Sequence, residues 1–393
     1  MLDCTVPALV LRLDPNNFHH GTLGAIRSLG RAGVEVHGLL GETDSPTSRS
    51  KYLARAHAWP RGGDLGDPGD DIVRTLTQVA QSIGRPAVLL ALDDAGAIAV
   101  AEHAAELRPY YLIPDQVPGL PRALADKSLL AQLCSAFGVV QPETRLITGE
   151  RDAAEAVSDF GLPLVAKWAQ PWLLPAGIGL RNTSLVRWPG EVPRLLQHLE
   201  ASDLLFQRFV PGGPHADWFF HGYFDENSRC LYGGAGRKER AHPKGAGLTT
   251  YGRWLPNPVV EGTARELAER LGYRGVLDID FRHDAGRDAY HLLDFNPRLG
   301  AQFRLFSDSS GLDLVRAAHL HLSGRRAPRG RAGHGRTYVV ENYDLLTAGP
   351  KSLRALCSAD EFAWLSADDP RPFVAMARQA MKRGFTRLAR QWA

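Results

Sequence analysis

Lysine is scarce in this 393-residue sequence, which has seven lysines against 39 arginines. Arginine therefore carries most of the positive charge, and each internal lysine becomes a candidate functional residue. Lys127 opens a helical pattern, and Lys167 stands within the apolar run LPLVAKW. A lysine buried without an anion would be strongly destabilising, so Lys167 points to a bound anion. The alternative is an ammonium group that reaches solvent along its aliphatic stem.

Cysteine is also rare, and the four cysteines form no CxxC pair. Their scatter excludes a zinc site of the usual spacing and a disulfide framework, and it predicts reduced thiols in a cytoplasmic protein. No run approaches the roughly 18 apolar residues of a membrane span, and the start lacks the basic and apolar regions of a signal peptide. We therefore expect neither feature.

The formal net charge of +3 is too small to indicate a nucleic-acid partner. The charge is uneven, however, because the stretch from Arg371 onward has six basic residues and no acid. That stretch also carries apolar residues at helical spacing: Val374, Ala377, Met381, Phe385, Leu388 and Trp392. We expect this helix to pack on its own protein. The alternatives are an anionic membrane or a carrier domain.

Strands alternate with helices over residues 1–120, which predicts an α/β domain with a parallel sheet. Residues 121–323 have several short strands with tight turns, which predicts an α+β domain with a more antiparallel sheet. We divide it into a lid at about 140–203 and a second half at about 204–323. Residues 324–336 are rich in Gly, Arg and Pro and form the expected linker, and 337–393 form a small, mostly helical tail.

Residues 275–298 carry the most informative pattern, GVLDIDFRHDAGRDAYHLLDFNPR. Apolar and acidic residues alternate on both sides of a turn, which predicts a β-hairpin with one acidic face. A turn centred on Arg287 pairs Asp280 with Asp294, and residue 278 with Asn296. Facing carboxylates repel unless a cation lies between them, and hard oxygen ligands suit Mg²⁺. The alternative is an acidic face turned to water, but Pro297 and Gly300 bend the chain where a simple edge strand would not need it.

The common nucleotide-binding signatures are absent. No Gly-Lys dipeptide occurs anywhere, which excludes a phosphate loop of the GxxxxGK type, and the Gly177-x-Gly179 segment lacks the third glycine of a dinucleotide fingerprint. A set of ordered segments instead resembles the ATP-grasp superfamily, and more closely its carboxylate–amine ligases related to D-aspartate ligase. The resemblance covers about residues 8–310 through HHGTLGAIRSLGRAGVEVHG, ADKSLL, FGVVQPET, LPLVAKW, LLFQRFVPGG and the 275–300 hairpin.

The resemblance implies roles for individual residues. It implies that ATP is held by Lys127 and Lys167 at the phosphates, by the segment Gln207, Phe209 and Val210 at the adenine, and by Asp217 at the ribose. It implies that Mg²⁺, as two ions and with Mn²⁺ able to substitute, is bound by Asp280, Asp294 and Asn296. Arg298, Arg237 and Lys238 would act on the transferred phosphate or the substrate carboxylate.

The implied activity is an ATP-dependent ligase that joins a small carboxylate to a small amine. The carboxylate would attack the γ-phosphorus to give an acyl phosphate and ADP, and the amine would then displace phosphate to form an amide. Such phosphoryl transfer needs positioning and charge stabilisation rather than a side-chain nucleophile. The alternatives are carboxylation or phosphotransfer on the same fold, or a nucleotide-binding regulator without turnover.

Two features depart from the superfamily pattern. Asp294 stands where Glu is commoner, and the lid turn PWLLPAGIGLRN has few glycines for a loop that cradles phosphate. Asp278 is chemically suited to be an additional ligand, although the resemblance does not assign it that role. Near the start, the amides after His19 could receive a substrate carboxylate, whereas Asp93 is expected to cap a helix.

Overall fold

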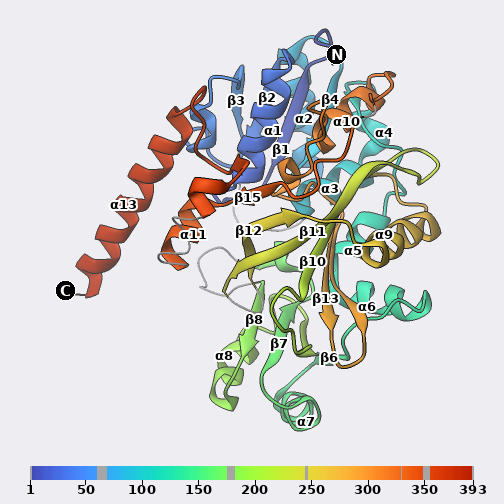
Figure 1. Ribbon diagram of the computed structural model, residues 1–393, viewed down its shortest axis with the longest axis vertical. Coiled ribbons are helices and arrows are strands. Elements are labelled where there is room, and N and C mark those ends of the chain that lie inside the picture. The colour runs from blue at the N-terminus through green and yellow to red at the C-terminus, as the bar shows by residue number, and fades with distance from the viewer. Residues whose placement is uncertain are drawn as a thin grey trace.

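The computed structural model describes residues 2–59, 69–174, 182–243, 247–328, 330–347 and 355–391 (Figure 1). The first part of the chain forms a five-stranded parallel sheet in the order β3-β2-β1-β4-β5. Its strands are β1 (Ala8–Arg12), β2 (Val36–Leu40), β3 (Arg55–Ala58), β4 (Ala87–Ala91) and β5 (Tyr111–Leu112). The parallel α/β architecture expected from the sequence is thus confirmed.

Helices accompany this first sheet and bury their apolar faces. They are α1 (His20–Arg31), α2 (Gly69–Ile83), α3 (Asp94–Glu102) and α4 (Ala104–Leu107), with a short 3₁₀ turn, η1 (Thr47–Arg49). In α1, Leu23, Ile26 and Leu29 are fully buried, as their helical spacing predicts. Helices α3 and α4 are separated at His103.

The lid is a four-stranded antiparallel sheet in the order β6-β9-β7-β8. Its elements are β6 (Thr144–Ile147), α7 (Glu150–Phe160), β7 (Leu164–Trp168), η2 (Pro171–Leu173), β8 (Thr183–Val186), η3 (Pro189–Glu191), α8 (Val192–Leu196) and β9 (Leu204–Arg208). Strand β9 begins just after the expected end of the lid and completes this sheet. Residues 175–181, most of the lid turn discussed above, lie outside the described residues.

The largest sheet has seven strands in the order β14-β13-β10-β11-β12-β15-β16, and only its β15–β16 pair is parallel. Its strands are β10 (Asp217–Phe224), β11 (Cys230–His242), β12 (Leu248–Trp254), β13 (Gly275–Asp284), β14 (Ala289–Asn296), β15 (Thr337–Val339) and β16 (Glu361–Phe362). The tail expected to be mostly helical therefore also contributes two strands to this sheet.

Further helices join the sheets, namely α5 (Leu120–Ala125), α6 (Lys127–Ala136), α9 (Pro258–Leu271), η4 (Phe303–Leu305), α10 (Leu314–Leu322) and α11 (Glu341–Thr347). Helices α5 and α6 are separated at Asp126, whose carboxylate accepts hydrogen bonds from the amides of Ser128 and Leu129. This cap makes Lys127 the first residue of α6 and fixes its position.

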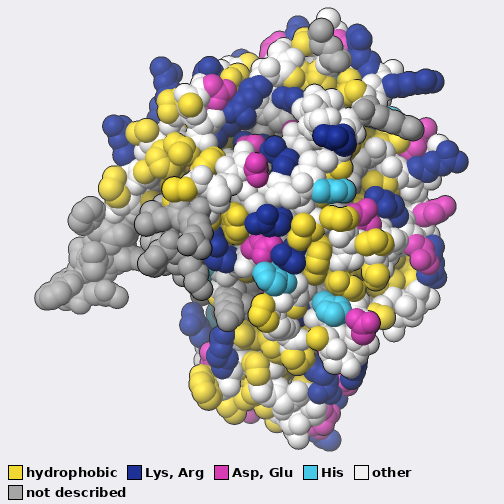
Figure 2. Space-filling model, in the orientation of Figure 1, with side chains coloured by type: hydrophobic (Ala, Val, Ile, Leu, Met, Phe, Trp, Pro, Cys, Tyr) yellow, Lys and Arg dark blue, Asp and Glu magenta, His cyan; other side chains and the backbone are white. Residues whose placement is uncertain are grey.

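The C-terminal helix α13 (Arg371–Gln391) extends away from the body at the side of the molecule (Figure 1). The prediction that an apolar stripe packs is wrong at Val374 and Met381, which are 42% and 58% exposed. Trp392 and the side chains of Phe385 and Leu388 lie outside the described part of the chain. Met376 is buried and Phe373 packs beside it in the central hydrophobic core. Hydrophobic side chains accordingly show on the surface over α13 (Figure 2). Among the described residues, no helix is both long and apolar enough to cross a membrane.

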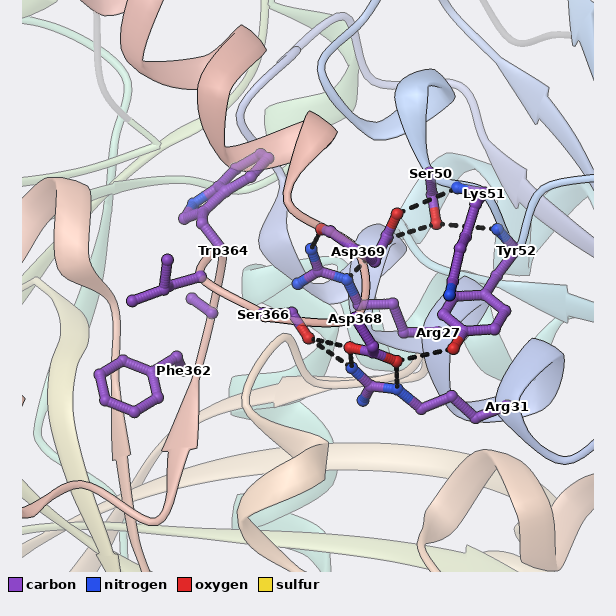
Figure 3. Close-up of polar contacts among 12 residues, drawn as sticks. Arg27, Arg31, Ser50, Lys51, Tyr52, Phe362, Trp364, Ser366, Asp368 and Asp369 are labelled. Atoms are coloured by element: carbon purple, nitrogen blue, oxygen red, sulfur yellow. Dashed lines mark hydrogen bonds and ion pairs between the residues drawn. The ribbon is translucent and has the colours of Figure 1, made fainter.

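The segment before α13 fastens the tail to the first sheet (Figure 3). Asp369 accepts hydrogen bonds from Arg27 of α1 and from Ser50 and Lys51 beyond η1. The neighbouring Asp368 pairs with Arg31, also on α1. One core cluster includes residues of the first sheet, of β10 and of the tail, so the three regions pack together.

Candidate active site

The hairpin of β13 and β14 has the register expected from the sequence. Asp280 pairs with Asp294, and Asp278 pairs with Asn296. A β-bulge follows the first of these pairs. Phe281 therefore pairs with Leu292, and Leu293 has no partner in the ladder. The acidic face of the hairpin therefore exists as predicted, with its two central carboxylates on adjacent strands.

Lysines from other elements face both central carboxylates. Lys238 of β11 lies 2.7 Å from the Asp280 carboxylate, and Lys127 of α6 pairs with Asp294. Burial favours the protonated acid, but Lys127 and Lys167 together hold the pKa of Asp294 below its usual range. Burial prevails at Asp280 and raises its pKa, although Lys238 opposes this shift.

Lys167 lies on β7 of the lid sheet and points toward the hairpin. Its ammonium group donates a hydrogen bond to the carbonyl of Leu293, the residue at the bulge, and its side chain is 6% exposed. Burial lowers the pKa of Lys167, even though Asp294 favours its charged form. The structure thus places a buried lysine of the lid against the acidic hairpin. The apolar setting of Lys167 predicts its burial but not this position.

A cavity that is open to solvent lies between the lid sheet and the hairpin. Lys127, Lys167 and Gln207 all line it, so the structure brings together three of the six residues expected to hold the nucleotide. The rest of the lining includes apolar side chains of Leu130, Leu205 and Leu292. A cavity with apolar walls and two ammonium groups suits a ligand that has a flat apolar part and an anionic part.

The other three expected nucleotide residues do not line this cavity. Asp217 forms an ion pair of 2.6 Å with Arg282, and the carbonyl of Val210 accepts a hydrogen bond from the same guanidinium. The Phe209 ring stacks under Arg282 at 5.3 Å. Their roles at the adenine and ribose stay predictions, and Arg282 is a partner that the sequence pattern did not reveal.

Arg298 follows β14 and pairs with two acids. Its guanidinium lies 2.6 Å from Asp278 and 3.7 Å from Asp94 at the start of α3. Burial disfavours its charge, but these two carboxylates raise the pKa of Arg298 above its usual range. On its other side, Asp278 lies 3.1 Å from the fully buried His221. Asp278 therefore holds Arg298 in place, a role that the sequence analysis left open.

Gly300 explains part of the bend after the hairpin. A Cβ atom at this position would lie 2.2 Å from the His221 ring, so the close approach requires glycine. The sequence analysis missed His221, for which the only signal was a histidine inside the otherwise apolar run WFFHGYF. It also missed the contact of Asp94 with Arg298.

Arg237 and Lys238 are neighbours on β11 with different partners. Lys238 meets Asp280, whereas the Arg237 guanidinium lies 2.7 Å from Glu239 and over the Trp218 ring. The proximity of Asp280 raises the pKa of Lys238 above its usual range, although burial acts against it. Of these two residues, the structure brings Lys238 to the acidic hairpin and gives Arg237 a separate partner.

The donor set of the hairpin fits Mg²⁺ in chemistry. Asp280 and Asp294 offer carboxylate oxygens on adjacent strands, and the buried Asn296 lies two pairs further along the ladder. Within the described part of the chain, no group of three or more His, Cys, Asp or Glu side chains is arranged to hold a metal ion. The two carboxylates of the hairpin leave coordination positions for phosphate oxygens, as is usual for Mg²⁺.

The N-terminal candidates act as helix caps. His19 accepts a hydrogen bond from the amide of Thr22 at the start of α1, and Asp93 accepts one from the amide of Gly96 in α3. The capping expected for Asp93 is confirmed. The same function of His19 was not expected, since histidine is an uncommon cap.

The chain was compared with known protein sequences and solved structures. No family model matches the chain. The sequence is 24% identical over 240 residues to a D-aspartate ligase of Enterococcus faecium, a match that covers 58% of this chain and 57% of the relative. It is 22% identical to the C-terminal section of the carbamoyl phosphate synthase large chain of Methanopyrus kandleri, over 52% of this chain and 38% of the relative. The matches thus span about half or less of these relatives.

Solved structures share the fold over most of the chain. N5-carboxyaminoimidazole synthetase from Staphylococcus aureus, in complex with ADP, matches with a TM-score of 0.65 at 11% sequence identity. The match covers 90% of this chain and 87% of the synthetase chain. The biotin carboxylase domain of Hydrogenobacter thermophilus 2-oxoglutarate carboxylase, with MgADP and bicarbonate, has a TM-score of 0.57 at 15% identity, over 84% of this chain and 73% of its own.

Proposed function

We propose that this chain, an ATP-grasp protein by its sequence relatives and its fold, is an ATP-dependent ligase that couples a small carboxylate to a small amine. One observation carries the proposal: two buried lysines line a single cavity directly beside the carboxylates of the hairpin. Cations that flank a cavity next to paired carboxylates are the arrangement that a nucleoside triphosphate and its divalent cation require.

The basic residues of the site bind different groups of the substrates. Lys127 and Lys167 neutralise phosphate oxygens, and each leaves its present protein partner, Asp294 or the Leu293 carbonyl, to do so. Arg298, fixed by Asp278, presents a guanidinium to the transferred phosphoryl group. The substrate carboxylate oxygen forms a bond to the γ-phosphorus as the bond to the ADP oxygen breaks. The amine nitrogen then attacks the acyl carbon, phosphate leaves, and the amine loses a proton.

Asp280, Asp294 and Asn296 would hold Mg²⁺, which supplies Lewis-acid neutralisation of the phosphate charge when it is bound. In the structure the ammonium groups of Lys127 and Lys238 balance the same carboxylates. Lys167 connects the lid sheet to the hairpin through its hydrogen bond to the Leu293 carbonyl, so both elements would contact the phosphates. No side chain needs to act as a nucleophile.

A second candidate is carboxylation through an activated bicarbonate. It is favoured by the fold comparison, because the synthetase and the biotin carboxylase domain described above both match over most of this chain. In that reaction bicarbonate takes the place of the organic acid in the attack on the γ-phosphorus. The two candidates share every residue discussed so far and differ in the acid that is activated.

The test measures ADP release with a panel of amino acids and small amines, each with and without bicarbonate, followed by mass spectrometry of the product. We expect Asp294→Asn and Lys167→Met to lower kcat by about 10²–10³, the usual loss for one group that stabilises charge in a transition state. Asp288→Asn is the matched control, because its side chain lies at the tip of the same hairpin and is 95% exposed.

The outcomes separate the candidates. An amide product without bicarbonate supports the ligase, and a product heavier by one carboxyl group, formed only with bicarbonate, supports carboxylation. Turnover unchanged in Asp294→Asn contradicts both. ATP binding without ADP release under every condition identifies a nucleotide-binding regulator instead.

A further inference from the structure

The outer face of α13 is apolar, although it is turned away from the protein. Val374 and Met381 are 42% and 58% exposed, whereas Met376, on the opposite side of the helix, is buried in the central core. Val374 and Met381 are seven residues apart, which places them on one side of the helix, two turns from each other. Figure 1 shows α13 along the edge of the molecule, and Figure 2 shows yellow side chains over it. This side of α13 is therefore an apolar surface that the described part of the protein leaves uncovered.

The sequence continues the same spacing beyond Met381. Phe385, Leu388 and Trp392 follow at intervals of four, three and four residues, which are the intervals that keep successive residues on one helical face. The first two of these positions lie within α13, which ends at Gln391. Large aliphatic and aromatic residues on one face of a basic helix are typical of helices that lie in the boundary between lipid headgroups and acyl chains.

Only positive charge accompanies this apolar stripe. All 43 acidic residues of the chain precede Arg371, and six basic residues follow from that position onward. Arg371 and Arg378 are exposed, and neither forms an ion pair with a residue that the structure describes. Arg378 lies four residues after Val374 and three before Met381, so it stands beside the stripe. An anionic surface is therefore attracted to α13 more than to the rest of the chain, where acidic residues are in the majority.

We propose that α13 binds the surface of a membrane that contains anionic lipid, with its axis parallel to that surface. The stripe of Val374, Met381, Phe385 and Leu388 enters the boundary between headgroups and acyl chains. The arginines beside it reach the lipid phosphates along their aliphatic stems. This property goes beyond the proposed function, because none of the residues assigned to ATP, Mg²⁺ or phosphoryl transfer lies on α13.

The distribution of charge favours lipid over a protein partner. A protein groove presents carboxylates at fixed positions, so its partner needs arginines at matching positions. The six basic residues of α13 are instead spread over its whole length, and helical spacing places them around much of its circumference. A layer of anionic headgroups neutralises such a distribution without any fixed register. A single exposed helix face is also convex, which suits a soft layer of headgroups better than a shaped groove.

The helix can bind a membrane without leaving the protein. The buried Asp369, just before α13, pairs with Arg27 at 2.9 Å. Further along, the Gln379 side chain donates to the carbonyl of Asp44 in the loop before η1. Met376 remains in the core on this inner side, opposite the exposed stripe. The two sides of α13 thus serve different contacts, and both can be occupied at the same time.

The experiment measures co-sedimentation of the full chain with vesicles of phosphatidylcholine alone and of phosphatidylcholine mixed equally with phosphatidylglycerol. We expect binding to the mixed vesicles only, and weaker binding at high salt, because salt screens exposed charges. Arg371→Gln combined with Arg378→Gln should weaken binding by about 25-fold, since each basic residue near an anionic surface contributes about fivefold. The affinity of this variant for a nonhydrolysable ATP analogue should stay within twofold of the wild type.

A second variant tests the apolar stripe. Val374→Glu combined with Met381→Glu should weaken vesicle binding by at least about 100-fold, because two apolar side chains no longer enter the lipid. Both side chains are exposed, so the variant should fold and bind the ATP analogue as the wild type does. The matched control is Val259→Glu combined with Val117→Glu, which makes the same change of charge at two apolar residues that are 57% and 52% exposed outside α13. It should bind mixed vesicles within about twofold of the wild type.

Three results would overturn the inference. They are wild-type protein that binds neither kind of vesicle, equal binding to both kinds, and undiminished binding of the Val374→Glu, Met381→Glu variant. Sedimentation equilibrium without vesicles identifies the other occupant of this face. Self-association that the same variant abolishes, in a protein that binds no vesicles, would assign the stripe to a second copy of the chain instead of a membrane.

Discussion

The Nε atom of Arg27 lies 2.9 Å from a carboxylate oxygen of Asp369, and the two side chains are 0% and 1% exposed (Figure 3). The guanidinium also donates to the backbone carbonyl of Asp369. Because Asp369 additionally accepts from Ser50 and Lys51, it joins α1 to the loop beyond η1. A residue of the C-terminal tail therefore holds α1 and the loop beyond η1 together.

Removal of this buried charge should destabilise the protein strongly. In Asp369→Asn the shape is kept, but Arg27 is left as an uncompensated buried charge, and breaking such a pair lowers the free energy of unfolding by about 3–5 kcal/mol. The adjacent Asp368→Asn is the matched control, since Asp368 and its partner Arg31 are 42% and 31% exposed. An exposed pair contributes about 0–1 kcal/mol. Urea unfolding of the three proteins measures the difference, and equal losses in the two variants would contradict the argument.

The hairpin could be predicted from the sequence because its signals are local. Apolar and acidic residues alternate on both sides of a turn, so the facing of Asp280 and Asp294 follows from counting. The ion pair of Arg27 with Asp369 could not be found in this way, since more than three hundred residues separate the two and neither belongs to a pattern. The prediction that Met381 packs was wrong because helical spacing alone does not identify the face of α13 that meets the core. In the structure Met376, and not Met381, is buried there.

A methyl group at Gly300 should impair catalysis more than folding. In Gly300→Ala the new Cβ atom displaces the His221 ring, which then releases Asp278 and with it Arg298. We expect kcat for ADP release to fall by at least tenfold, while the affinity for the ATP analogue is unchanged. Gly262→Ala is the control, because a Cβ atom there meets nothing within 4 Å inside α9. That variant should be about 1 kcal/mol more stable and fully active.

Low pH should lower the free energy of unfolding because of His20, the first residue of α1. Burial lowers the pKa of His20 from 6.5 to about 3, so the unfolded chain binds a proton that the folded protein excludes. This contribution to stability is present above pH 6.5 and is lost as the pH falls toward 3. Between pH 7.5 and 5 the loss amounts to about 2 kcal/mol. His20→Gln should reduce the pH dependence of the urea midpoint by that amount, and identical pH profiles of variant and wild type would show that His20 is not the group responsible.

Two adjacent basic residues on β11 provide the sharpest test of the acidic hairpin. Both Arg237 and Lys238 were expected near the reacting groups, but Lys238 lies 2.7 Å from Asp280 whereas Arg237 pairs with Glu239. Lys238→Met leaves Asp280 without its ammonium partner and removes a cation from the site, so kcat for ADP release should fall by about 10²-fold. Arg237→Met removes the same charge one residue away and should lower kcat by less than tenfold. Steady-state ADP release at saturating ATP measures both variants. A larger loss in Arg237→Met would place the reacting phosphate on the Glu239 side of the strand and would remove Asp280 from the proposed metal site.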